Sequence, residues 1–149
     1  MPPHPKAEPP KIVFLFSDTG GGHRSACEAI IEALDLEYPG GFRAGMVDIF
    51  RQYAPPPFAL APDIYPTLSR MPEMWGLGYR VSNGPRRTQV MNEMVWPYIR
   101  RSINRLLVEN PCDLLVSVHQ LSNAPFLKTL KEREALGNPK IPFASVVTD

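Results

Sequence analysis

The segment from Ser17 to Arg24, read as Ser-Asp-Thr-Gly-Gly-Gly-His-Arg, is the part of this chain whose residue types best suit chemistry. Glycines let a backbone approach a ligand closely, and a helix that begins after them offers free N–H groups and a partial positive charge. A histidine in that first turn suits a general base that removes a proton from a hydroxyl group. We therefore take His23 as the candidate catalytic residue. The candidate substrate-binding residues of the turn are Ser17, Asp18, Thr19, Gly20, Gly21, Gly22 and Arg24.

Two well-known glycine motifs do not fit this turn. A P-loop would need GxxxxGK followed by serine or threonine, and no such string is present. A dinucleotide fingerprint would need a third glycine where this chain has Ser25, and Asp48 is the one acidic residue near the end of the next expected strand. A tight turn that needs glycine only for steric reasons remains the alternative reading.

The elements around the turn predict an α/β fold. Residues 11–17 form a continuous apolar run, which is typical of a strand buried on both faces of a parallel sheet. Residues 23–36 carry apolar side chains at helical spacing, and residues 42–50 predict a second strand. Ligands of open parallel sheets bind beyond the carboxyl ends of the strands, where this turn would lie.

The second half of the chain continues the alternation. We expect a helix over about 88–109, with a kink or a new helix start at Pro97, and then a strand at 113–119, a helix at 123–136 and a strand at 142–149. These elements predict a Rossmann-like parallel sheet flanked by helices. Because no helix follows to cover the last strand, we expect either an edge strand or, preferably, a piece of a longer protein.

His119 ends the strand at 113–119 and is a second candidate substrate-binding residue, since it would reach the same edge of the sheet as His23. A strand-end histidine that only forms a hydrogen bond to a loop is the alternative.

Composition limits the remaining possibilities. A chain of 149 residues fits one domain, and a net charge of +1 argues against a broad basic surface for nucleic acid. No apolar run reaches the length of a spanning helix, and Cys27 and Cys112 have no metal-like or disulfide-like spacing. The proline-rich residues 1–10 predict a disordered tail before a domain at 11–149.

The strings FLFSDTGGGHRSACEAI, NPCDLLVSVH and PFASVVTD together resemble the monogalactosyldiacylglycerol synthases and the bacterial processive diacylglycerol glucosyltransferases. The resemblance covers about residues 11–149. It implies the N-terminal, acceptor-side domain of a two-domain GT-B glycosyltransferase, with the C-terminal donor domain absent from this chain. It further implies inverting transfer of a hexose from UDP-galactose or UDP-glucose to diacylglycerol, with no cofactor and no tightly bound metal. Asp149 matches the start of a family segment and joins the candidate substrate-binding residues, whereas Gln120 stands where relatives commonly have proline.

A lipid-facing surface is predicted from the middle of the chain. Arginines outnumber acidic residues between Arg70 and Arg105, and aromatic residues accompany them, a mixture suited to a membrane interface. The candidate lipid residues are Trp75, Tyr79, Arg80, Arg86, Arg87, Arg101 and Arg105. We expect a protein that is cytoplasmic and peripheral on a membrane, with anionic lipid as a partner and no nucleic acid; a solvated helix face is the alternative.

Two other functions stay open at this point. One is a transferase that adds N-acetylglucosamine to a lipid-linked peptidoglycan precursor, although that family typically has a GGTGGH-like turn followed by proline. The other is a non-catalytic Rossmann-like module that binds a nucleotide or a protein, for which His23 would be dispensable.

Overall fold

The computed structural model describes residues 8–18, 22–56, 58–68, 70–71, 73–74, 76 and 85–147, and for residues 58, 61, 65, 68 and 85–92 it describes the backbone alone. The elements are β1 (Lys11–Phe16), α1 (Gly22–Glu37), β2 (Arg43–Asp48), α2 (Ile49–Tyr53), η1 (Phe58–Leu60), α3 (Ala61–Leu68), α5 (Pro85–Glu109), β3 (Leu114–Ser117), α6 (Gln120–Ala135) and β4 (Phe143–Ser145). The strands that the structure describes form one four-stranded sheet in the order β2-β1-β3-β4, and every pair is parallel. The predicted Rossmann-like arrangement is confirmed.

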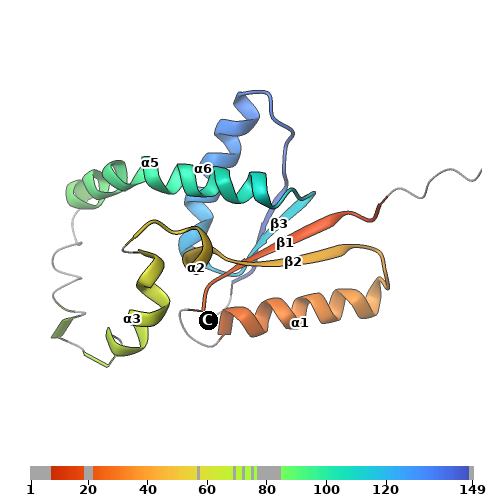
Figure 1. The fold of residues 1–149 in the computed structure, drawn as a ribbon, viewed down its shortest axis with the longest axis horizontal. Helices are drawn as coiled ribbons and strands as arrows, with labels where there is room; N and C mark the ends of the chain where they lie inside the picture. The colour runs from red at the N-terminus through yellow and green to blue at the C-terminus, as the bar shows by residue number, and fades with distance from the viewer. Residues whose placement is uncertain are drawn as a thin grey trace, which may run out of the picture.

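Both faces of the sheet are covered, which explains the apolar run of β1. Val13 and Leu15 point into a core shared with α5 and α6, and Phe14 and Phe16 point into a second core shared with α1. Figure 1 shows α1 on one side of the strands and α5 with α6 on the other. All four β1 side chains are buried, as the continuous apolar pattern predicts.

The helix α1 ends as its sequence predicts. Gly40 has a φ of 68° and Gly137, which follows α6, has a φ of 85°, conformations that glycine adopts without steric cost.

Before β1, the side chain of Glu8 forms an ion pair with Arg43 at 3.0 Å, so this end of the tail contacts β2. Residues 1–7 of the predicted disordered tail lie outside the described residues.

Several boundaries differ from the prediction. The second strand ends at Asp48 and not at Phe50, because the Asp48 carboxylate caps the helix α2 that starts there. β3 and β4 are shorter than the strands expected at 113–119 and 142–149, so His119 follows β3 and does not end it. α5 begins at Pro85 and runs as one helix through Pro97, so of the two expected alternatives, a kink or a new helix start, the new start is excluded. α6 begins at Gln120, three residues before the predicted start at Asn123.

In the part of the chain that the structure describes, no helix combines the length and the apolar character needed to cross a membrane.

Candidate functional site

The carboxyl edge of the sheet brings together the residues that sequence analysis singled out. Ser17 and Asp18 follow β1, Asp48 ends β2, and His119 follows β3. Because the strands are parallel and in register, these positions lie at one edge, where α1 also begins (Figure 1). Ser17 is fully buried, whereas the Asp18 side chain is partly exposed and accessible to a ligand.

The two histidines of this edge lie against each other. The ring centroids of His23 and His119 are 4.7 Å apart, and the rings are tilted by 56°. His23 is half-buried in the first turn of α1, whereas His119 is 6% exposed. Burial lowers the pKa of His119 below its ordinary value, and the positive charge of a protonated His23 lowers it further, with Asp48 acting in the opposite direction. His119 is thus held as a neutral imidazole beside the candidate base.

Arg24 and Asp18 form a bidentate ion pair on either side of the turn. The guanidinium donates to both carboxylate oxygens, at 3.0 and 2.7 Å, and it also lies 4.6 Å from the centre of the Phe16 ring. The hydrogen bonds from Arg24 hold the pKa of Asp18 below its ordinary value, and burial opposes this effect. Arg24 could bind an anionic ligand after one of its two hydrogen bonds to Asp18 has broken.

Asp48 is a site residue that sequence analysis noted only as a poor match to a nucleotide motif. Its carboxylate accepts from the backbone N–H groups of Phe50 and Arg51 at 3.0 and 2.9 Å, and from that of Asp18 at 3.3 Å. Asp48 is 3% exposed, and Arg51 lies 3.9 Å from it. It therefore ties α2 to the turn that precedes His23. An aspartate between an apolar strand and an apolar turn is a recognisable N-cap signal, which could have located it.

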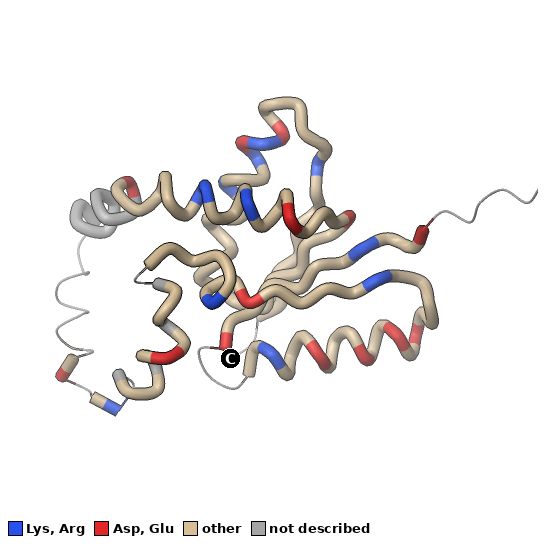
Figure 2. Tube along the Cα trace, viewed as in Figure 1, with Lys and Arg blue, Asp and Glu red and all other residues tan. Residues whose placement is uncertain are grey.

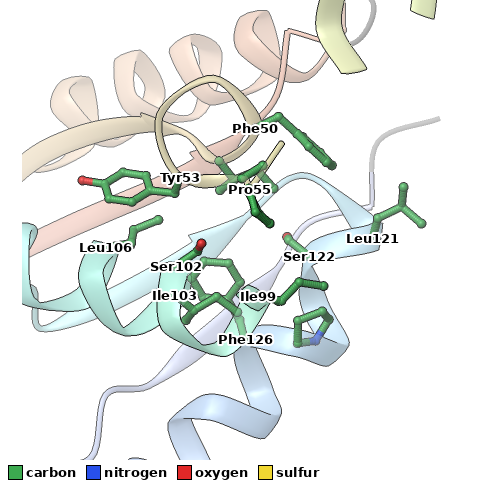
Figure 3. A pocket seen from close by; sticks show the side chains of 13 residues that line it. Phe50, Tyr53, Pro55, Ile99, Ser102, Ile103, Leu106, Leu121, Ser122 and Phe126 are labelled. Carbon is green, nitrogen blue, oxygen red and sulfur yellow. The ribbon is translucent and has the colours of Figure 1, made fainter. Parts of the chain in front are cut away.

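An apolar pocket of about 250 Å³ opens next to this edge, between α2, α5 and α6. It is lined by Ile49, Phe50, Tyr53, Ala54, Pro55, Ile99, Ser102, Ile103, Leu106, Leu121, Ser122, Pro125 and Phe126. Figure 3 shows these side chains converging from the three helices. Leu121 at 76% exposed belongs to the rim, while Leu106 and Phe126 are buried and form the floor. Phe50 connects the pocket to the histidines, since its ring lies 5.4 Å from that of His119.

The sequence profile of the monogalactosyldiacylglycerol (MGDG) synthase family matches residues 23–149. The chain belongs to the MGDG synthase family. The resemblance drawn from the sequence strings is thereby confirmed, and the matched range includes both histidines, Asp48 and the whole pocket lining.

Curated MGDG synthases from plants align along almost the entire chain. A probable MGDG synthase of Nicotiana tabacum, described as chloroplastic, is 32% identical over 97% of this chain and 27% of its own length. The chloroplastic enzymes of Spinacia oleracea and Arabidopsis thaliana are 33% and 32% identical, over 95% of this chain and 27% and 26% of their lengths. The chain therefore spans about a quarter of the length of these relatives.

Several residues of the predicted MGDG synthase site lie outside the described residues. These are Thr19, Gly20, Gly21, Trp75, Tyr79, Arg80 and Asp149. Arg86 and Arg87 lie in the first turn of α5, and their side chains are likewise not described. Their predicted roles remain predictions.

Of the predicted lipid residues on α5 that the structure describes, Arg101 is exposed and Arg105 has partners within the chain. Arg105 donates to the Gln52 carbonyl at 2.8 Å, pairs with Glu109 at 3.5 Å and lies 5.0 Å from the centre of the Tyr53 ring. Arg105 thus holds α2, a wall of the pocket, against α5. Arg101 and Arg105 lie one helical turn apart and would repel each other. The ion pair of Arg105 with Glu109 reduces this repulsion.

Among the residues that the structure describes, no group of three or more His, Cys, Asp or Glu side chains is arranged to hold a metal ion.

Proposed function

We propose that this chain is the acceptor-binding half of an inverting glycosyltransferase that moves a hexose from a UDP-sugar to diacylglycerol. The donor, UDP-galactose or UDP-glucose, would be held mainly by a second domain that this chain does not contain. We refer to this chain together with that donor domain as the complete enzyme. Membership of the MGDG synthase family supports the reaction, and the diacylglycerol-based product in the names of the relatives supports the acceptor.

The observation that carries the proposal is the position of the apolar pocket next to the histidine pair. Diacylglycerol has a small polar head with one free hydroxyl and long apolar chains. The pocket offers an apolar lining with only serine hydroxyls and the Tyr53 hydroxyl near it, as an acyl chain requires. Phe50 lines the pocket and lies 5.4 Å from His119, which in turn lies 4.7 Å from His23, so a chain in the pocket would bring the glycerol hydroxyl toward the histidines.

In the proposed reaction, His23 removes the proton of the acceptor hydroxyl as its oxygen attacks the anomeric carbon of the donor. The bond from that carbon to the diphosphate oxygen breaks, and UDP leaves with the electron pair. The proton stays on His23 until solvent removes it. Attack from the face opposite the leaving group inverts the configuration at the anomeric carbon. The rate enhancement comes from holding the hydroxyl, the base and the donor close together. The turn with Arg24 would face the donor phosphates.

We further propose that the domain docks on the cytoplasmic side of an anionic membrane as a peripheral protein. Figure 2 shows acidic residues along α1 and basic residues on α5. Exposed apolar side chains gather on α3, the segment after it and the first half of α5, among them Ile64, Met71 and Met94. α3 and the N-terminal end of α5 lie at one end of the long axis in Figure 1, and α1 extends toward the other end. An anionic surface would attract the arginine-rich side and repel α1.

A direct test uses vesicles that contain diacylglycerol. The isolated chain should bind diacylglycerol, with shifts of methyl and aromatic NMR signals confined to the pocket lining. It should transfer no hexose from UDP-galactose or UDP-glucose, because the donor is not held. The complete enzyme should transfer it. Turnover by the isolated chain, or shifts confined to the outer face of α1, would overturn the proposal.

A further inference from the structure

His119 has a main chain that is fixed from several directions. Its carbonyl accepts from the backbone N–H and the hydroxyl of Ser122 at 3.1 and 2.6 Å. Its own N–H donates to the Ser117 hydroxyl at 3.3 Å, and the two serine hydroxyls lie 2.8 Å apart. These bonds lock the short turn from β3 into α6, so the direction in which the imidazole leaves the backbone is set by the fold.

The ring of His119 lies against both the candidate base and a residue of the pocket lining. Its centroid lies 4.7 Å from that of His23 and 5.4 Å from that of Phe50. The residue is 6% exposed, so its ring offers little surface to a bound acceptor. By contrast, His23 is half-buried in the first turn of α1. The buried ring of His119 packs against it.

We propose that His119 is a positioning residue, whose buried ring holds the imidazole of His23 in the orientation that meets the acceptor hydroxyl. It exchanges no proton with the substrate. This inference rests on the proposed function, because it assumes that His23 acts on an acceptor. The physical requirement is a flat ring of about the size of imidazole at this position, since a reacting group that is misplaced by about 1 Å loses roughly 10²-fold in rate.

Three substitutions separate ring contact from the other roles of His119. His119→Phe keeps a flat ring and removes the nitrogens. His119→Ala removes the ring, and His119→Leu removes it while keeping most of the volume. In the complete enzyme, kcat should stay near the wild-type value for His119→Phe and fall roughly 10²-fold for the other two. The KM for diacylglycerol should change little in all three, because His119 does not line the pocket.

A measurement without turnover keeps the inference testable on the isolated chain. The chain has three histidines, so the ring signals of His4, His23 and His119 can be assigned by substitution. We expect a nuclear Overhauser effect between ring protons of His23 and His119. We also expect the His23 ring signals to keep their shifts in His119→Phe and to move in His119→Leu toward the shifts of the urea-unfolded chain.

The outcomes decide between the roles. Equal loss of kcat in His119→Phe and His119→Leu would overturn the inference, because the nitrogens would then be needed. Normal kcat in His119→Leu, or the absence of the Overhauser effect, would overturn it as well. If the wild-type complete enzyme transferred no hexose to diacylglycerol, the proposed function would fail, while the NMR signals would still decide whether His119 orients His23.

Discussion

The carboxylate of Asp48 accepts a hydrogen bond from the backbone N–H of Asp18 at 3.3 Å, across the ends of two neighbouring strands. The same carboxylate caps α2, whose residues form one wall of the apolar pocket. One buried side chain therefore links the turn that carries His23 to the surface that would hold an acyl chain.

Replacing Asp48 should destabilise both α2 and the turn that precedes His23. Asp48→Ala leaves backbone donors of Phe50, Arg51 and Asp18 without their acceptor, and we expect a loss of about 2 kcal/mol in the free energy of unfolding. Asp48→Asn should lose less, because asparagine also caps helices. Urea unfolding of the isolated chain measures both values. Equal stability of the alanine variant and the wild type would show that the link is not needed.

The buried imidazole predicts how stability depends on pH. His119 has an ordinary pKa of 6.5 when unfolded and a lower pKa when folded. Between these values the unfolded chain binds more protons, so stability falls as the pH drops below 6.5 and is fully present above it. His119→Phe should lose this part of the slope, which thermal unfolding at pH 7.5 and about 5.5 would reveal. If stability depended on pH equally in the variant and the wild type, His119 would not be the group that causes this dependence.

The apolar pocket can be filled without removing core atoms. Ser102 lines the pocket from α5, so Ser102→Phe should occupy the space meant for an acyl chain. We expect the KM of the complete enzyme for diacylglycerol to rise roughly 10-fold, since excluding a few methylenes costs about 1–2 kcal/mol. Val108→Phe, on the exposed side of the same helix, is the matched control and should leave KM unchanged. Normal KM in Ser102→Phe would remove the pocket from the acceptor site.

Much of this fold follows from the sequence because burial and periodicity are local signals. The apolar run of β1 and the spacing of α1 predicted a parallel sheet with helices, and the structure confirms it. The end of β2 was mispredicted because Ile49 and Phe50 continue an apolar pattern, and this pattern was given more weight than the N-cap signal of Asp48.

The candidate site was also predicted only in part from the sequence. His23 could be named from its place in the first helical turn after the glycines, and His119 from its place near the end of a strand; the structure brings their rings together. The pocket could not be foreseen, because its lining comes from three helices that are distant in sequence and meet only in the folded chain. The partners of Arg105 were missed for the same reason, since Gln52 and Tyr53 lie about fifty positions earlier.

Membrane binding provides a test of the predicted lipid surface. The chain should bind vesicles that contain anionic lipid, and binding should weaken as salt rises. Replacing Arg86 and Arg87 together by alanine should weaken binding roughly 30-fold at about 1 kcal/mol per charge, and Trp75→Ala should weaken it too. The matched control replaces Lys131 and Lys140, two exposed cations of α6 and the loop before β4, and should bind as the wild type does. Equal loss in both double variants would indicate a general effect of charge.

The central claim is that His23 is the base of an acceptor site, and His23→Ala in the complete enzyme tests it most directly. We measure kcat for hexose transfer to diacylglycerol, together with thermal unfolding and vesicle binding of the same variant. The account predicts a kcat lower by about 10²- to 10⁴-fold, the usual contribution of a positioned proton acceptor, in a protein that folds and binds vesicles like the wild type. A folded variant that keeps a kcat near that of the wild type would contradict the account, and the base would then have to lie elsewhere in the cleft.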